Sequence, residues 1–328
     1  MLKYIVWRVL MMIPTLVAIS IVSFVIIQLP PGDFLTSYLA QLITMGETVS
    51  EETLEALRSR YGLGAPIYVQ YWTWIKGIVT QGDFGMSLLW GRPVSELLWE
   101  RVSLTVAVSL SSVLFIWFVA SPIGIYSAVK QYSIGDYIFT FFGFLGLATP
   151  PFMLALVVLW IVFSWTGSVL VGLFSPEFVG AAWSFGKVID LFSHMWIPMI
   201  ILGTAGTAGT IRVIRAQMLD ELPKPYVVTA RAKGVSELKL LFKYPVRIAL
   251  NPFFSTLGWL LPRLIAGEVL VSIVLNLPTT GPLLLGALVN QDMYLAGSFM
   301  LILSTLTVIG TLISDILLAW VDPRIRYS

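Results

Sequence analysis

Few side chains in this 328-residue sequence could carry out a chemical reaction. The chain contains no cysteine and a single histidine, His194, so neither thiol chemistry nor a His-Glu-x-x-His zinc site can be built. A Gly-x-x-x-x-Gly-Lys-[Ser/Thr] loop, which would bind the phosphates of ATP, does not occur in the sequence. We therefore predict no intrinsic catalytic site, no metal site and no cofactor held by this chain, and we expect His194 to be an interfacial histidine.

The most distinctive chemistry lies in a basic stretch from Pro225 to Ser236. Small residues that let a partner backbone approach alternate there with basic residues of a polar face: Thr229, Ala230, Arg231, Ala232 and Lys233. Gly234 can adopt a positive φ and end a short helix, and Ser236 can cap the next one, with Glu237 in its first turn. We expect two short helices that bend at the glycine and lie along a surface. The composition is equally typical of a basic loop that interacts with anionic lipid, and this alternative stays open.

The overall composition places this stretch in a membrane protein. The sequence is 57% hydrophobic and 12% charged, whereas soluble domains carry about 25% charged residues. So little charge cannot cover the surface of a 36.4 kDa globule in water. The 12 Trp, 12 Tyr and 19 Phe exclude a disordered chain, and the net charge of +2 is too small to indicate nucleic acid binding. The sequence predicts an all-α integral membrane protein.

Six apolar stretches are long enough to cross a bilayer core of roughly 30 Å, which needs about 20 residues of helix. They are Val9–Leu29, Val102–Val129, Tyr137–Trp165, Leu191–Ile211, Pro252–Leu275 and Leu295–Val321. Pro150 and Pro151 interrupt the third span and predict a kink. The glycine- and threonine-rich run 203–210 predicts close helix packing, with a moving pore-lining helix as the alternative.

The distribution of basic residues predicts the orientation, because lysine and arginine are retained on the cytoplasmic side. With six spans both termini lie on one side, and that side holds thirteen of the twenty basic residues. These are Lys3, Arg8, Lys130, Arg212, Arg215, Lys224, Arg231, Lys233, Lys239, Lys243, Arg247, Arg324 and Arg326. The termini and the 220–251 loop are therefore predicted to be cytoplasmic, and the 30–101 segment and the 166–190 loop external.

The sequence divides into three regions. Residues 1–101 comprise the N-terminal helix and an external amphipathic segment, 102–321 a core of five spans, and 322–328 a cytoplasmic tail. Within the external segment Ser50 predicts a capped short helix, and the amphipathic stretch Val69–Val79 suits the headgroup boundary.

Three ionisable residues fall inside predicted spans: Arg263, Glu268 and Asp315. A charge at the centre of a membrane helix costs at least about 2.5–3.5 kcal/mol, so such residues usually face a cavity or one another. Glu268 is therefore expected either to line a translocation path, where it contacts a positive group of the substrate, or to form an interhelical pair with Arg263, with Asp315 or with a sister subunit.

Residues 226–234, Tyr-Val-Val-Thr-Ala-Arg-Ala-Lys-Gly, followed by Arg247 and Asn251-Pro252, resemble the "EAA" loop of ATP-binding-cassette (ABC) importer permeases. The resemblance is to the oligopeptide/dipeptide/nickel branch and covers nearly the whole chain. Its other motifs, in order, are Pro31-Gly32-Asp33, Tyr61-Gly62-Leu63, Val69-Gln70-Tyr71, Gly82 to Ser87, Gly91-Arg92-Pro93-Val94, Arg215, Leu277-Pro278, Asp315 and Asp322 to Arg326. Each motif is weak alone, whereas the ordered series is specific.

The resemblance implies a type I (MetI-like) permease core that moves when separate subunits hydrolyse ATP. It implies a coupling helix that docks into an ATPase subunit through Tyr226, Thr229, Ala230, Arg231, Ala232, Lys233 and Gly234. The implied partners are a second homologous permease, two ATP-binding subunits that hold ATP and Mg²⁺, an external substrate-binding protein and membrane lipid. The implied location is the cell membrane, as a multi-pass protein with both termini cytoplasmic.

The sequence departs from the family pattern in three places. Pro223-Lys224-Pro225 stiffens the approach to the coupling helix, and Thr279-Thr280-Gly281-Pro282 replaces Gly-x-Gly-Arg in an external turn. The family's usual glutamate would fall at Ser272, whereas the acid here is Glu268. Positions four apart share one helix face, so Glu268 and Ser272 are together the candidates for the translocation path.

The resemblance implies di- or oligopeptides as the substrate, with oligosaccharides or nickel chelates as alternatives for the same machinery. A self-contained secondary transporter or channel is the competing class, and it predicts mid-membrane coupling acids and inverted repeats. The sequence shows no convincing repeat and few charges within the spans. These observations favour an importer subunit.

Overall fold

The computed structural model describes residues 2–28, 65–87, 89–169, 171–251 and 268–321. Their regular structure is helical, with one isolated antiparallel bridge between Met86 and Pro93. The chain forms two compact units, which we describe separately. Unit 1 comprises Met1–Val6, Leu104–Gly281 and Ile309–Ser328, and unit 2 comprises Trp7–Ser103 and Pro282–Val308. The boundaries after residues 101 and 321 stay predictions.

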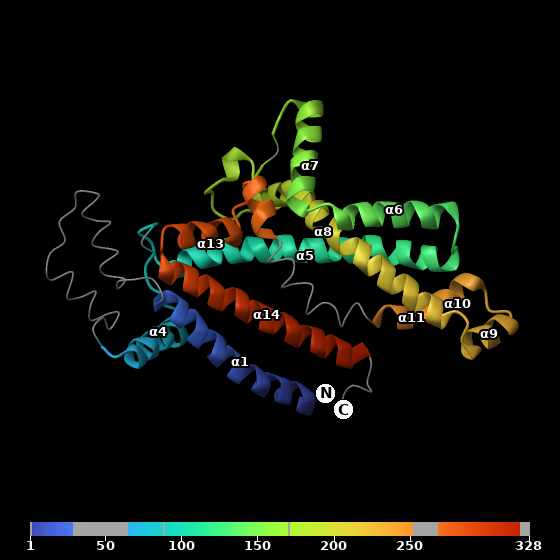
Figure 1. Cartoon of the computed structure of the whole chain (residues 1–328), viewed down its shortest axis with the longest axis horizontal. Helices are drawn as coiled ribbons and strands as arrows, with labels where there is room; N and C mark the ends of the chain where they lie inside the picture. Colours follow the sequence, from blue (N-terminus) through green and yellow to red (C-terminus); the bar gives the residue numbers. More distant parts are fainter. Residues whose placement is uncertain (1, 29–64, 88, 170, 252–267, 322–328) are drawn as a thin grey trace. The chain divides into compact units, whose positions relative to one another are not determined.

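Each unit is built from segments distant in the sequence (Figure 1). Unit 1 contains most of α5 (Val94–Val129), then α6 (Ile134–Ala148), α7 (Pro151–Thr166), the 3₁₀ turn η1 (Pro176–Phe178), α8 (Phe185–Glu221), α9 (Pro225–Ala232), α10 (Glu237–Lys243) and α11 (Pro245–Ala249). Unit 2 contains most of α1 (Leu2–Gln28), α4 (Ile67–Gln81), the start of α5, most of α13 (Thr280–Val289) and the first half of α14 (Met293–Val321).

The described helices agree with five of the six predicted spans. α1, α5, α8 and α14 are each long and apolar enough to cross a membrane, and the bent pair α6–α7 makes a fifth crossing if it counts as one span. Residues 268–274 of the predicted span Pro252–Leu275 are helical, and residues 252–267 lie outside the described part of the chain. The predicted amphipathic stretch Val69–Val79 lies within α4, and its place at the headgroup boundary stays a prediction.

Several predictions fall on residues that lie outside the described ranges. They concern the Ser50-capped helix, Arg263, and the motifs Pro31-Gly32-Asp33, Tyr61-Gly62-Leu63 and Asp322 to Arg326.

The kink predicted at Pro150 and Pro151 is confirmed as a complete break. α6 ends at Ala148, Pro150 precedes α7 as its N-cap, and Pro151 is its first residue. Proline has no backbone N–H to donate to the preceding turn, so two in succession end one helix and allow the next to begin. The two helix axes differ in direction by 107°, and Figure 1 shows them nearly perpendicular.

The small residues of α8 pack against neighbouring helices, as predicted. A Cβ atom added at Gly146 of α6 would lie 2.7 Å from Cγ2 of Thr204, and one at Gly203 would lie 2.4 Å from Cδ1 of Phe115 in α5. Real Cβ contacts are longer than this, so both glycines are needed for the close approach of the helices. Because glycine has no side chain, Gly146 and Gly203 allow α8 to lie close to α6 and α5.

A buried ion pair fixes the register between α6 and α8. Asp136, in the first turn of α6, is 3% exposed, and it accepts hydrogen bonds from Arg215 Nη2 at 2.9 Å and from the backbone N–H of Tyr132 at 3.0 Å. Ser133 caps the same helix by accepting from the Asp136 N–H. Burying a carboxylate is costly unless donors surround it, so this arrangement specifies one position of α6 along α8.

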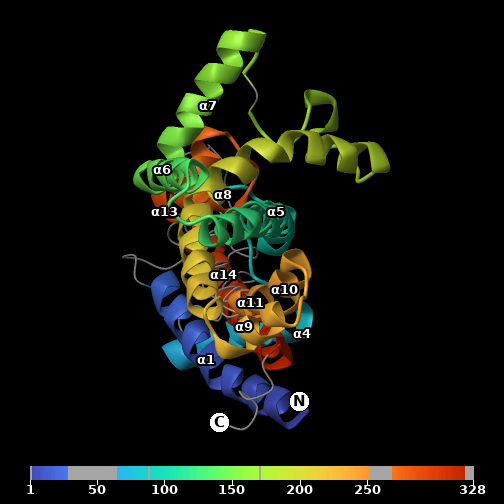
Figure 2. The ribbon, with the colours of Figure 1, turned by 90° about the vertical axis from the view of Figure 1, so that its right-hand side faces the viewer.

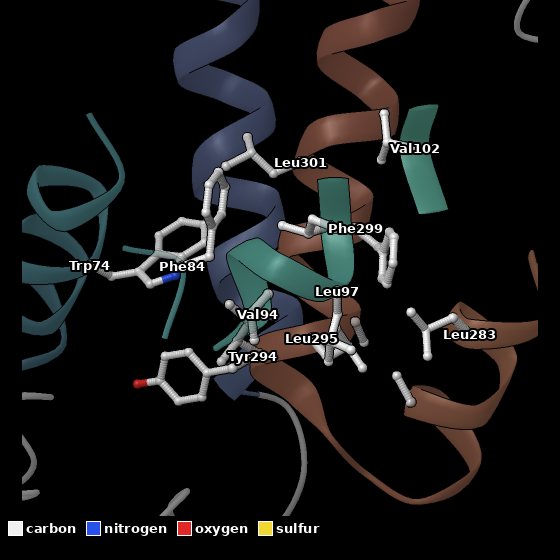
Figure 3. Packing of buried hydrophobic residues seen from close by; sticks show 14 of the residues in the cluster. Trp74, Phe84, Val94, Leu97, Val102, Leu283, Tyr294, Leu295, Phe299 and Leu301 are labelled. Carbon is white, nitrogen blue, oxygen red and sulfur yellow. The ribbon is translucent and has the colours of Figure 1, made fainter. Parts of the chain in front are cut away.

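Unit 2 has its own apolar core, in which residues of α4 and the following loop meet those of α5, α13 and α14 (Figure 3). Trp74, Phe84, Leu97, Leu295 and Phe299 are each at most 7% exposed. Because this core joins residues near position 80 to residues near position 295, it forms only when both parts of the chain are present.

A buried aspartate connects the same two parts of unit 2. Asp292 is fully buried, and its Oδ2 accepts hydrogen bonds from Ser87 Oγ at 2.5 Å and from the Leu89 N–H at 3.0 Å. Its Oδ1 accepts from the Leu295 N–H at 3.3 Å, which caps the start of α14. The motif Gly82 to Ser87 is thus held to α14 by a carboxylate 205 residues from Ser87.

Replacing this aspartate should destabilise the protein. We expect Asp292→Ala to cost roughly 1–3 kcal/mol, because it leaves Ser87 Oγ and two backbone N–H groups without their acceptor. Thermal unfolding of the purified chain in detergent measures the effect. Ser87→Ala should cost less in the Asp292→Ala background than alone, because the hydrogen bond to Asp292 is already lost there and only the one from the Trp90 N–H remains to be removed. Fully additive losses would contradict the assigned contact.

Candidate functional site

The loop between α8 and residue 251 contains three short helices, as its turn residues require. Pro225 occupies the first position of α9, where the missing N–H costs nothing, and Lys224 is the N-cap residue. α10 begins at Glu237, directly after Ser236. Figure 2 shows α9, α10 and α11 grouped beside the end of α8. The prediction of two short helices with a bend at Gly234 is confirmed.

Gly234 ends α9 in a Schellman motif. Its φ is +77°, its N–H donates to Arg231 O at 3.0 Å, and the Val235 N–H donates to Ala230 O at 3.3 Å. A Cβ atom at this position would meet nothing within 4 Å. Glycine is therefore required here by the backbone conformation and not by crowding.

The inner face of α9 packs onto α10. Val227, Ala230 and Leu240 are buried together, with Val235 and Tyr244 packed partly against them. Ala230 is only 7% exposed because it faces α10, and its role in docking stays a prediction.

The outer face of α9 retains the other predicted contact residues. The exposed residues are Thr229, Arg231, Ala232, Lys233 and Gly234. Tyr226, at the beginning of the helix, is 37% exposed. Thr229 Oγ1 donates to Pro225 O at 2.8 Å, which leaves its methyl group and the Ala232 side chain as a low, apolar strip. Such a surface can lie flat in a groove of another protein.

An exposed ion pair braces the bend. Arg231 Nε lies 2.6 Å from Glu237 Oε1, and Nη2 lies 3.2 Å from Oε2, so the guanidinium contacts both carboxylate oxygens. The hydrogen bond from Arg231 lowers the pKa of Glu237 below its ordinary value. The pair links the last turn of α9 to the first turn of α10 across Gly234.

A carboxylate at the end of α8 holds the first turn of α9. Glu221 is the last residue of α8 and is 4% exposed, and its side chain accepts hydrogen bonds from Lys224 Nζ and from Tyr226 Oη. Burial, together with the hydrogen bond that Tyr226 donates to Glu221, raises the pKa of Tyr226 to about 12. Sequence analysis did not single out Glu221. The signal was an acid placed three and five residues before a lysine and a tyrosine.

The loop is also attached to the membrane helices through an apolar cluster. Leu241 of α10 and Val246 and Ala249 of α11 pack with Ile214 and Met218 of α8. All five are at most 8% exposed. α9 is therefore connected to α8 twice, through Glu221 at its start and through α10 at its end.

Glu268 and Ser272, the candidates for the translocation path, lie together in a buried polar cluster of unit 1. Glu268 is 1% exposed, Ser272 Oγ donates to its Oε1 at 3.3 Å, and Thr279 Oγ1 donates to Ser272 Oγ at 2.9 Å. Glu268 Oε2 has no hydrogen-bond partner among the described residues. Next to this cluster, Thr105 Oγ1 accepts from the Thr280 N–H at 3.0 Å. Of the two threonines that depart from the family pattern, Thr280 therefore holds the turn to α5 and Thr279 holds it to Ser272.

His194 lies near the beginning of α8 in a small polar group. Its Nδ1 is 2.9 Å from Asp190 O and 3.0 Å from Ser193 Oγ. Asp190 also accepts hydrogen bonds from the N–H and hydroxyl of Ser175, at 2.7 and 2.6 Å. These contacts tie the loop before α8, which contains Ser175, to the beginning of that helix.

The contact between Tyr226 and Glu221 predicts an abnormal tyrosine titration. The tyrosinate absorbance of the unmodified chain minus that of Tyr226→Phe should show a midpoint near pH 12 instead of the ordinary 10. Because the folded pKa is the higher one, the stabilisation from the neutral phenol is complete below pH 10 and is lost as the pH rises to 12. Glu221→Gln should move the midpoint part of the way back, since burial remains. A midpoint at 10 would contradict the contact.

Comparisons with known proteins identify the family. A family model described as the inner membrane component of binding-protein-dependent transport systems matches residues 120–327, and the model of the N-terminal part of such components matches residues 1–110. The chain is 38% identical over 328 residues to the oligopeptide transport system permease protein AppB of Bacillus subtilis (strain 168), and each chain is covered completely.

Two further relatives are also matched over their whole length. The dipeptide transport system permease protein DppB of Alkalihalophilus pseudofirmus is 31% identical over 341 residues, and the glutathione transport system permease protein GsiC of Escherichia coli (strain K12) is 31% identical over 328 residues. The chain therefore belongs to the family of binding-protein-dependent transport system inner membrane components and is a permease subunit of an ABC importer.

Proposed function

We propose that this chain imports peptides as one of two homologous permease subunits, together with two ATP-binding subunits and an external substrate-binding protein. The observation that carries the proposal is the outer face of α9, which is low, exposed and fixed to α8 through Glu221. The ATP-binding subunits supply ATP and Mg²⁺, for which this chain has no phosphate loop.

In this mechanism α9 acts as a coupling helix. Closure of the ATP-binding subunits moves the groove that holds α9, and the movement reaches α8 through Glu221 and through the apolar cluster of α10 and α11. α8 in turn is packed closely on α5 and α6, so the membrane helices shift together between inward-facing and outward-facing states. Gly234 sets the angle between α9 and α10.

Peptides are the substrate class that the relatives favour. The relatives' names specify oligopeptides, dipeptides and glutathione, which is itself a peptide. Oligosaccharides and nickel chelates lack this support. A binding protein that partners this permease should gain thermal stability from peptides and not from oligosaccharides, and the reverse result would reassign the substrate.

The orientation follows from the same proposal. The loop containing α9 faces the cytoplasm, where ATP is available, and both termini lie on that side. The buried carboxylate of Glu268, with Ser272 beside it, belongs to the translocation path and contacts a positive group of the peptide. Its Oε2 is buried without a hydrogen-bond partner among the described residues, so it is the acceptor that such a positive group would satisfy.

A substitution at Gly234 tests the coupling role. Gly234→Val places a branched residue at a φ of +77°, which costs about 1–2 kcal/mol and distorts the end of α9. We expect the variant chain to fold and to reach the membrane, and ATP-dependent peptide uptake by the assembled transporter to be lost. Uptake of labelled peptide into vesicles measures the effect.

Gly180 provides the matched control. Its φ is +75°, a Cβ atom there meets nothing within 4 Å, and it lies in the predicted external loop. Gly180→Val therefore carries the same backbone strain without touching α9, and uptake should persist. Normal uptake by Gly234→Val would refute docking through α9. Accumulation of solute by the purified chain alone, reconstituted without other subunits, would instead indicate a secondary transporter.

A further inference from the structure

α10 has an apolar face that no described residue covers. Leu238 is 72% exposed and Phe242 is 63% exposed, and residues four apart lie on one side of a helix. Leu240 and Leu241 point in other directions and are buried against α9, α8 and α11. Transfer of two large apolar side chains from water to an apolar environment is favourable, so this face is suited to such an environment.

The same helix has a basic edge beside that face. Lys239 and Lys243 are exposed and lie about 100° around the helix from Leu238 and Phe242, one residue further along in each case. The one acid of α10, Glu237, is already paired with Arg231. An apolar strip flanked by two lysines is typical of a helix that lies in the headgroup boundary of an anionic membrane.

The packing of α10 places it at the level where the membrane helices end. Leu241 belongs to the cluster that contains Ile214 and Met218, near the end of α8, and Ala128, in the last turn of α5. Both α5 and α8 are long and apolar enough to cross a membrane. A helix packed on their last turns lies beside the bilayer surface.

We propose that α10 lies in the headgroup boundary of the cytoplasmic leaflet, where Leu238 and Phe242 enter the acyl region and Lys239 and Lys243 bind anionic lipid headgroups. The opposite charges of lysine and lipid argue for this partner, because each lysine near an anionic surface contributes favourably and its long stem lets the ammonium reach the phosphates. The proposal rests on the proposed orientation of the chain and not on ATPase docking.

The two interpretations that the composition of this loop left open then apply to different helices. α9 presents small residues to a protein, and α10 presents leucine, phenylalanine and lysine to lipid. The ion pair between Arg231 and Glu237 and the bend at Gly234 keep these two surfaces at a fixed angle.

Spin labels measure the depth of α10. Because the chain contains no cysteine, Leu238→Cys and Phe242→Cys each introduce a single labelling site, and Thr229→Cys on the outer face of α9 is the matched control. The full chain is placed in nanodiscs of phosphatidylcholine, with or without phosphatidylglycerol. The relaxation of each label is then measured once with oxygen, which dissolves in lipid, and once with a water-soluble nickel chelate.

We expect the labels at 238 and 242 to be relaxed by oxygen and protected from the nickel chelate in nanodiscs containing phosphatidylglycerol, and the label at 229 to show the reverse. Lys239→Gln with Lys243→Gln should reduce the protection at 238. Equal exposure of 238 and 229 to the nickel chelate would overturn the proposal. So would protection at 238 that arises only when ATP-binding subunits are added, which would assign the face to that protein. Protection independent of phosphatidylglycerol would overturn the role of the lysines.

Discussion

The first turn of α9 is held to the end of α8 by one buried carboxylate, that of Glu221. It ends α8, and Lys224 and Tyr226 both donate hydrogen bonds to it from the turn that follows and from the start of α9. A buried carboxylate that loses its donors pays a desolvation penalty of several kcal/mol. Separating Lys224 and Tyr226 from Glu221 is therefore costly. The first turn of α9 must therefore move with α8, although three residues of non-helical chain separate the two helices.

The helices of unit 1 can transmit such a movement because they pack closely on one another. Gly146 and Gly203 allow close approach of α6 to α8 and of α8 to α5, and the pair of Asp136 with Arg215 prevents α6 from sliding along α8. Close-packed interfaces transmit displacement, because no void is available to absorb it. The buried polar groups thus fix positions along the helices, and the glycines fix the distances between them.

Local chemistry made part of this structure predictable from the sequence. Proline without an N–H and glycine with a positive φ act on their own neighbours, so the break at Pro150 and Pro151 and the end of α9 at Gly234 could be predicted. Span ends were less accurate. α5 begins at Val94, well before the predicted start of the span at Val102. The charged residues before Val102 end the apolar stretch but do not interrupt the backbone hydrogen bonds of the helix.

The remaining features depend on direction or on distance along the chain. The burial of Ala230 against α10 could not be predicted, because a helix of eight residues has too few turns for a periodic pattern to show which side is buried. The contact of Glu221 with Tyr226 requires the turn at residues 222–224. Pro223 and Pro225 predicted a stiff segment there but not the direction in which it turns. No local pattern could connect Ser87 to Asp292, since the chain between them contains most of the protein.

That last contact has a consequence for how the chain is made. Ser87, Phe84 and Trp74 emerge from the ribosome long before Asp292, Leu295 and Phe299, the residues with which they form the interior of unit 2. Early in synthesis α1 and α4 can already pack on each other through Phe24, Tyr71 and Trp74, but the later residues that complete this interior are not yet made. Unit 2 is therefore complete only after α14, its last helix, has been translated.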